Sequence, residues 1–164
     1  MTTEQFPAWG EDHLRYVVSQ ALPEDRRDVE RLVRQCGKEV RDYFDMRNLD
    51  AYWDSGSVWM LHVSPVEEPV GFAVVYMQRR KPVLSLYDIG VHPEWRRFGL
   101  GTALMYGVFG WYREKHGAER LRLVVSATND VAIGTYRKWG LEALELKETR
   151  RNGTVAVMEG VPWS

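Results

Sequence analysis

Three apolar segments follow one another through the middle of the chain, in "VWMLHVSPVEEPVGFAVVYMQRRKPVLSLYDIGV", residues 58–91. They are rich in β-branched and aromatic residues, which is typical of β-strands. Prolines and charged residues at 65–69 and 79–82 separate the segments and are typical of turns. The pattern therefore predicts three successive strands joined by two short turns.

Helical and extended patterns alternate on either side of these strands. "HLRYVVSQAL" (13–22) predicts a first strand, and Pro23, Glu24 and Asp25 then open a helix, because proline and acids favour its first turn. Residues 41–57 predict a short helix or a loop. Residues 101–116 and 129–139 predict helices that end at Gly117 and Gly140, with a buried strand at 120–127 between them.

The last segment, "LELKETRRNGTVAVMEG", places an Asn-Gly pair between two alternating runs. Asn152 and Gly153 therefore predict a hairpin with a type I′ turn. A run of antiparallel strands followed by a β-α-β unit predicts a mixed sheet covered by helices. We expect one domain over residues 1–164.

Composition and charge exclude several classes of protein. With 45% hydrophobic and 27% charged residues, the chain reads as an ordinary soluble globular protein. It has neither a signal peptide pattern nor an apolar run near the ~18 residues that cross a bilayer, so we expect a cytoplasmic protein without membrane contact. The net charge of −1 gives no general reason to bind nucleic acid, and we predict none as a partner.

Cysteine and histidine contribute little chemistry. Cys36 is the single cysteine, which excludes an intramolecular disulfide, and its apolar helical face favours a buried, inert thiol over a nucleophile. His62 and His92 have no spacing that indicates a metal site, and we predict none. His92 before Pro93 is expected only to end a strand.

Glycines and arginines gather where the third central strand is followed by a helix, in "RRFGLGTALM". The first N–H groups of a helix lack intrahelical partners and lie at its positive end. Gly99 and Gly101 allow a ligand close to the backbone, and Arg96 and Arg97 add positive charge. This combination predicts a cradle for phosphate or pyrophosphate, although glycines that serve tight packing would show the same spacing. Neither a P-loop lysine nor the third glycine of a dinucleotide fold is present.

Two motifs here resemble those of the GNAT superfamily of N-acetyltransferases. Arg96-x-x-Gly99-x-Gly101 is similar to its acyl-CoA-binding motif, and "NDVAIGTYRKWGL" is similar to its second motif. The residues in register with the second motif are Asn129, Ala132, Tyr136, Lys138 and Gly140, with Leu141 replacing the usual aromatic. The resemblance covers residues 84–141, and two motifs in the correct order are much more specific than either alone.

The resemblance implies an α+β GNAT fold: a mixed, largely antiparallel sheet of about seven strands with about four helices, in which strands 4 and 5 diverge to form the acetyl-CoA cleft. It implies that cradle amides hold the pyrophosphate and that neighbouring backbone holds the pantetheine arm. The expected coenzyme-binding residues are Ile89, Val91, Arg96, Arg97, Phe98, Gly99, Leu100, Gly101, Thr102 and Asn129. Gly90 would mark the bulge of that strand or pack beneath an aromatic ring. Asn129 would also cap the following helix.

Acetyl transfer by direct attack through a tetrahedral intermediate needs a neutral amine, a stabilised oxyanion and a proton for the departing thiolate. The resemblance assigns the proton to Tyr136, although that residue also shares an apolar helical face, and assigns polarisation of the thioester carbonyl to the Val91 N–H. Asp88 is the nearest acid to the expected thioester. It would relay a proton through water or accept a structural hydrogen bond. Some relatives that acetylate diamines carry a carboxylate one position earlier, where this chain has Tyr87.

The acceptor is expected to be a small primary amine. Residues 39–57 interleave acids with aromatic residues, which would bind a cation, although an amphipathic helix shows the same pattern. These residues are Asp42, Asp45, Asp50 and Asp54, with Tyr43, Phe44, Tyr52 and Trp53. The alternative is a non-catalytic acyl-CoA-binding or regulatory module on the same fold. A homodimer, common in the family, is a further expectation.

Overall fold

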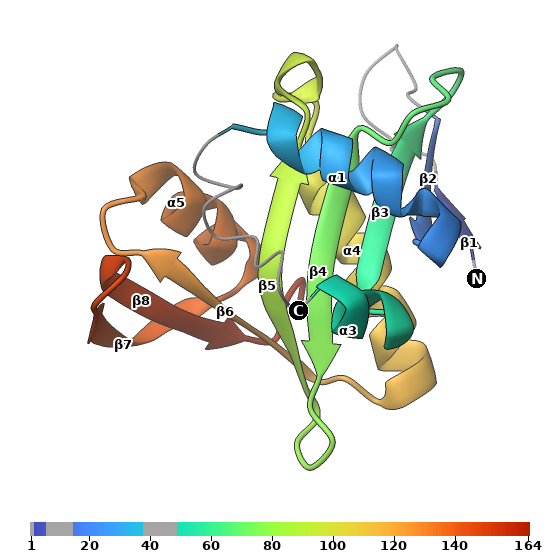
Figure 1. Ribbon diagram of the computed structural model, residues 1–164. Coiled ribbons are helices and arrows are strands. Elements are labelled where there is room, and N and C mark those ends of the chain that lie inside the picture. Colours follow the sequence, from blue (N-terminus) through green and yellow to red (C-terminus); the bar gives the residue numbers. More distant parts are fainter. Residues whose placement is uncertain (1, 6–14, 38–48) are drawn as a thin grey trace. The chain divides into compact units, whose positions relative to one another are not determined.

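The computed structural model describes residues 2–5, 15–37 and 49–164, which form two compact units (Figure 1). The first unit comprises Met1–Val75 and Asp88–Gly110, as far as these are described, and the second comprises Tyr76–Tyr87 and Trp111–Ser164.

Four antiparallel strands form most of the first unit. They are β1 (Thr2–Gln5), β2 (Tyr16–Gln20), β3 (Val58–Val63) and β4 (Gly71–Met77), paired in chain order. The end of β5 (Val83–Val91) follows beside the start of β4, where the His92 N–H donates to the Val70 carbonyl at 2.8 Å. The predicted strands and their turns are thus confirmed. The start of the strand predicted over 13–22 lies outside the described residues.

Helices cover both faces of these strands. The 3-10 helix η1 (Pro23–Asp25) leads into α1 (Arg26–Gln35), which with α3 (Leu49–Asp54) packs on one face. That core contains Val29, Leu32 and Val33 of α1 with Val58, Met60, Phe72 and Val74 of the sheet. Figure 1 shows α1 in front of β3 and β4 and α4 (Leu100–His116) behind them. On that rear face, Leu104 of α4 lies near Gly71.

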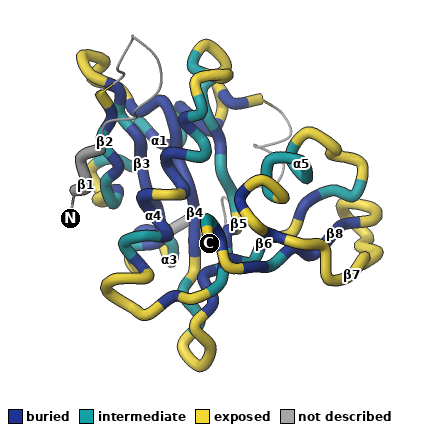
Figure 2. The backbone as a smooth tube through the Cα atoms, turned by 180° about the vertical axis from the view of Figure 1, so that it is seen from behind, coloured by how far each residue is buried: buried dark blue, intermediate teal, exposed yellow. Residues whose placement is uncertain are grey.

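The second unit contains the single parallel strand pair. The start of β5 pairs with β6 (Arg120–Ser126) from Val83↔Arg120 to Leu86↔Leu123. β6 then pairs antiparallel with β8 (Gly153–Gly160), and β8 with β7 (Glu142–Thr149). Helix α5 (Asp130–Trp139) connects β6 to β7. Figure 2 shows β7 exposed along its length, whereas much of β8 is buried.

The strand order, β1-β2-β3-β4-β5-β6-β8-β7, confirms the predicted mixed and largely antiparallel sheet. The additional strand is β1, which pairs with β2 and which the N-terminal sequence did not predict. Both glycine helix ends are also confirmed, since Gly117 and Gly140 have φ angles of 67° and 106°. None of the helices in the described ranges has the length and apolar character needed to cross a bilayer.

The β7–β8 hairpin is confirmed, but its predicted turn type is wrong. Thr149 pairs with Gly153, which leaves a loop of three residues at 150–152. A type I′ turn needs positive φ at both central residues, and of the non-glycine residues described only Arg97 and Trp163 have it. Gly153, at φ 65°, instead closes a three-residue loop, a geometry that also requires glycine. Thr149 stabilises the loop by accepting from the Asn152 N–H at 3.0 Å.

Candidate functional site

The turn between β5 and α4, in the first unit, has an unusual backbone. It begins with the 3-10 helix η3 (Pro93–Trp95), which His92 caps by accepting the Glu94 N–H at its Nδ1. His92 therefore ends the strand, as predicted. Arg97 and Gly99 then adopt left-handed φ angles of 73° and 71°. Alternation of left- and right-handed residues turns successive backbone N–H groups toward one side, the arrangement that forms anion-binding nests.

Helix α4 begins directly after this turn. The Ala103 N–H donates to the Gly99 carbonyl at 3.0 Å, and the N–H groups of Leu100 and Gly101 precede this bond at the start of the helix. A Cβ at Gly101 would meet only Val91 Cγ2, at 3.7 Å. The helix start is thus open in front of its first amides. This geometry fits the predicted pyrophosphate cradle.

Arg96 is held by the protein itself. Its Nε donates to the Val91 carbonyl at 3.1 Å and its Nη2 to the Cys36 carbonyl at 2.7 Å. These bonds join the cradle to the end of β5 and to the C-terminal cap of α1. The sequence predicted that the positive charge of Arg96 would bind the coenzyme. The structure shows that the guanidinium fixes the turn.

Gly90 lies beneath an aromatic ring, one of the two readings of its sequence. A Cβ there would approach Phe72 Cε1 to 2.6 Å and Cys36 Sγ to 3.0 Å. The interpretation that Gly90 packs beneath an aromatic ring is therefore confirmed, and the bulge in this strand stays a prediction.

The Asp88 carboxyl lies on the strand that leads into this turn, and its pKa is strongly raised. Its Oδ1 accepts the Ile89 N–H at 2.9 Å, and its buried Oδ2 has no hydrogen-bond partner within the described part of the chain. Burial raises the pKa of Asp88 to about 7, against the smaller opposing effect of the Ile89 hydrogen bond. Asp88 therefore accepts a local hydrogen bond and also retains a carboxylate oxygen able to take a proton near neutral pH.

Cys36 is buried, as the sequence predicted. Desolvation raises the pKa of its thiol to about 11, and the Asp88 charge acts in the same direction while the Arg96 charge opposes it. The thiol is therefore protonated and inert at neutral pH.

The second unit carries the residues of the second motif. Asn129 caps α5 by accepting the Ala132 N–H at 3.2 Å, which confirms its predicted capping role. Tyr136 is partly buried on α5 and packs edge-on against Trp139, with ring centroids 5.0 Å apart. Trp163 packs on the same tryptophan at 5.5 Å and donates its backbone N–H to the Trp139 carbonyl.

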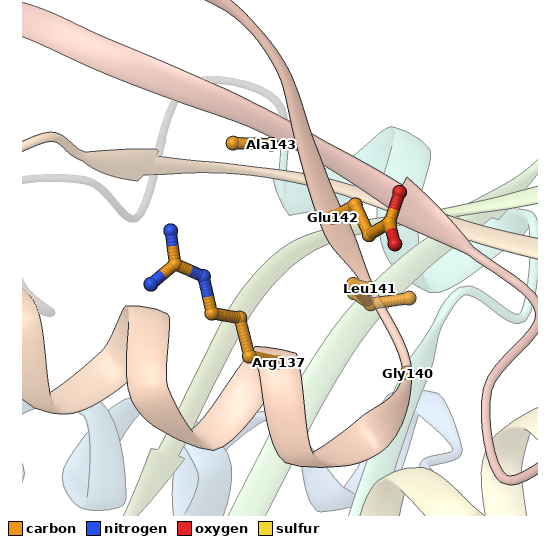
Figure 3. Close-up of a pocket in the computed structure, with 5 residues that line it drawn as sticks. All are labelled: Arg137, Gly140, Leu141, Glu142 and Ala143. Atoms are coloured by element: carbon orange, nitrogen blue, oxygen red, sulfur yellow. The ribbon is translucent and has the colours of Figure 1, made fainter.

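A shallow surface pocket of about 500 Å³ lies where α5 meets β7. Its lining residues are Arg137, Gly140, Leu141, Glu142 and Ala143 (Figure 3). Figure 3 shows the Arg137 and Glu142 side chains extending in different directions, so they do not converge on a common ligand. None of the predicted site residues lines this pocket.

Sequence reasoning missed the groups that hold the site together. Phe72 and the Cys36 carbonyl come from distant parts of the chain and carry no motif. It also missed the stacked pair of Tyr76 and Tyr87 on the β4–β5 hairpin. Of the acids and aromatics proposed to bind the acceptor, Asp42, Tyr43, Phe44 and Asp45 lie outside the described residues. Trp53 is buried in the core, as the alternative reading expected.

Known proteins are similar to this chain in sequence and in fold. The family model described as "Acetyltransferase (GNAT) family" matches residues 26–141. The 5-NmdU N-acetyltransferase of Pseudomonas phage PaMx11 is 31% identical over 127 residues, 76% of this chain and 85% of the relative. The mycothiol acetyltransferase of Salinispora tropica is 28% identical over 94 residues, 56% of this chain and 31% of that longer relative.

Among solved structures, Ard1 from Thermoplasma volcanium has a TM-score of 0.74 at 23% identity, over 91% of this chain and 99% of that one. At this identity the likeness shows the fold alone. The family match extends over both motifs and over the turn whose backbone forms the cradle. The chain therefore belongs to the GNAT family of acetyltransferases.

Proposed function

We propose that this GNAT acetyltransferase moves the acetyl group of acetyl-CoA, the donor that its family uses, to the primary amine of a small acceptor by direct attack. The observation that carries the proposal is the partly buried Asp88, with one carboxylate oxygen unpartnered among the described residues and a pKa of about 7. A base with this pKa is substantially ionised at neutral pH and still binds a proton well.

The cradle supports a pyrophosphate ligand. In this proposal the backbone N–H groups of residues 98–102 hold the pyrophosphate, and Arg97 adds positive charge from an exposed position. Arg96 contributes by keeping the turn in shape through its two carbonyl partners. By family resemblance, the pantetheine arm then bonds the Ile89 carbonyl and the backbone of Val91.

In this proposal three groups each carry out one part of the acetyl transfer. Asp88 accepts the proton that the amine loses as its nitrogen bonds to the acetyl carbon. The Val91 N–H stabilises the negative charge on the carbonyl oxygen, and Tyr136 supplies the proton to the departing thiolate. The roles of Val91 and Tyr136 rest on family resemblance. Asn129 caps α5 and, by the same resemblance, bonds the pantetheine arm.

The relatives support acetyl transfer more firmly than any one acceptor. One is named for 5-NmdU and the other for mycothiol, so similar chains serve different acceptors. We infer a small amine here because Asp88, in this proposal, takes a proton from an attacking nitrogen.

The test is the pH dependence of kcat/KM, followed by release of the coenzyme thiol, for the native chain and Asp88→Asn. Two acceptor amines of different pKa are used, because the amine's own ionisation moves with the amine whereas that of Asp88 does not. We expect a limb that rises with pH, has its midpoint near the Asp88 pKa of about 7 with both amines and is lost in the variant. The variant should lose about 10²- to 10⁴-fold in rate.

Glu114→Gln, an exposed change on α4, is the matched control and should leave the profile unchanged. Calorimetry with acetyl-CoA separates binding from chemistry, since Asp88→Asn should still bind the coenzyme. An unchanged midpoint and rate in Asp88→Asn would show that Asp88 is not the base.

A further inference from the structure

Two exposed tyrosines stack on the β4–β5 hairpin of the second unit. Tyr76 and Tyr87 lie on neighbouring strands with ring centroids 6.2 Å apart and planes only 17° from parallel. Tyr76 is 43% and Tyr87 55% exposed. Cross-strand aromatic pairs stabilise a sheet, but that role alone is served equally well by a covered pair. The described structure thus exposes part of each ring of this stacked pair to solvent.

The same hairpin carries a concentrated positive charge. Arg79, Arg80 and Lys81 are consecutive and exposed in the turn that joins the two strands. The ion pairs found within the described ranges include none of these three side chains. Glu119, whose N–H donates to the Pro82 carbonyl, is the acid next to the turn and leaves an excess of positive charge there.

The stacked tyrosines and the positive turn together favour some amine acceptors over others. A polyamine would be repelled by three cations at the turn. A simple alkylamine would use neither the aromatic surface nor the charge. An acceptor that combines a planar ring with an anionic group matches both, because bases stack on aromatic side chains and phosphates bind Arg and Lys.

We propose that the β4–β5 hairpin binds a nucleotide that bears the amine to be acetylated, with its base on Tyr76 and Tyr87 and its phosphate at Arg79, Arg80 and Lys81. This rests on the proposed function, which supplies the acetyl transfer to an amine. The nucleotide amine forms a bond to the acetyl carbon as the carbon–sulfur bond breaks. The amine proton passes to the base of the proposed reaction, and the coenzyme leaves as its thiol after taking a proton.

The experiment compares kcat/KM for three matched amines: 5-(3-aminoallyl)-dUMP, the nucleoside without the phosphate, and allylamine. Spermidine is a fourth, polycationic amine. We expect the nucleotide to exceed the nucleoside, and the nucleoside to exceed allylamine, each by about tenfold or more, since one stacked base contributes that much to binding. Equal values for the three amines, or a preference for spermidine, would overturn the proposal.

Variants of the hairpin residues test whether the hairpin causes the preference for the nucleotide. Tyr76→Ala should lower the ratio of nucleoside to allylamine about tenfold or more, whereas Tyr76→Phe retains the ring and the ratio. Replacing Arg79, Arg80 and Lys81 together by Gln should lower the ratio of nucleotide to nucleoside, whereas Lys115→Gln on α4 should not. Ratios that stay constant in Tyr76→Ala and in the triple variant contradict the assignment, even if overall rates fall.

A single-stranded oligonucleotide with one aminoallyl-dU distinguishes a free nucleotide from a base within a strand. Faster acetylation of either form supports the hairpin site and identifies its source. If no amine releases the coenzyme thiol, the proposed function fails, and quenching of tyrosine fluorescence by dUMP then tests the hairpin separately. Quenching in the native chain that is lost in Tyr76→Ala supports the binding site, and no quenching overturns it.

Discussion

The Arg96 guanidinium donates from Nη2 to the Cys36 carbonyl at 2.7 Å, so an arginine of the coenzyme motif is bonded to the end of α1. Its Nε bonds the Val91 carbonyl at the same time. One planar side chain thereby joins the cradle, β5 and α1. The family's motif arginine serves here to shape the site.

Arg96→Lys tests this role because lysine keeps the charge and loses the fork that reaches both carbonyls. We expect acetyl-CoA to bind about tenfold more weakly, as for the loss of one charged hydrogen bond. Calorimetry measures the affinity. Arg34→Lys, on the exposed side of α1, should bind normally. Native affinity in Arg96→Lys would mean that charge alone matters at this position.

Gly90→Ala should destabilise the chain by about 1–3 kcal/mol, because the new methyl group overpacks the core. The added carbon would lie 2.6 Å from Phe72 Cε1. Gly110→Ala is the control, since a Cβ in that helix meets nothing within 4 Å, and it should stabilise by about 0.5–1 kcal/mol. Urea denaturation measures both. Adding Phe72→Leu should restore part of the loss if the ring is the obstacle.

Arg97→Gly should raise stability while weakening coenzyme binding. Arg97 has a φ of 73°, which costs a non-glycine residue about 1 kcal/mol, and glycine removes that strain. The charge near the pyrophosphate is lost at the same time. Arg97→Ala separates the effects, since it should lose the same affinity without the gain in stability. Equal free energies of unfolding for the two variants would refute the strain.

The raised pKa of Asp88 predicts that the free energy of unfolding falls as pH rises. The folded chain holds this proton up to a pKa of about 7, against 3.8 for an ordinary Asp, so the contribution is complete below pH 3.8 and lost as pH rises through about 7. The effect is at most roughly 4 kcal/mol. Urea denaturation at several pH values should show this slope in the native chain but not in Asp88→Asn.

His62 contributes with the opposite sign to the same pH profile. Burial lowers its pKa, so its contribution to stability rises with pH. Subtracting the free energy of unfolding of Asp88→Asn from that of the native chain at each pH removes the contribution of His62. If that difference does not vary with pH, the Asp88 carboxyl has an ordinary pKa.

Asn129 caps α5 and is proposed to bind the pantetheine arm, and a pair of variants separates the two functions. Asn129→Ala loses the side-chain oxygen that caps α5 and should cost about 1 kcal/mol of stability. Asn129→Asp keeps an acceptor oxygen and should retain that stability. If the side-chain amide also donates to the pantetheine arm, both variants should bind acetyl-CoA more weakly in calorimetry. Normal binding by Asn129→Asp would leave capping as the role of Asn129.

Much of the fold was predictable because it depends on local chemistry. Alternating and apolar runs identified β3 to β8, and glycines identified the ends of α4 and α5. The N-terminal β1 was missed because its four residues form a strand through pairing with β2. The type of the β7–β8 turn was missed because strand register, rather than the Asn-Gly pair alone, set the loop at three residues.

The sequence by itself determined the order of the elements and the two family motifs, since spacing along the chain fixes both, and it predicted the cradle from its glycines and arginines. Only the tertiary structure decided the contacts of Arg96 and the surroundings of Asp88. Packing bonded Arg96 to the Cys36 carbonyl, 60 residues away, and buried Asp88 enough to raise its pKa to about 7. Burial and long-range hydrogen bonds depend on neighbours distant in sequence, and no local pattern encodes them.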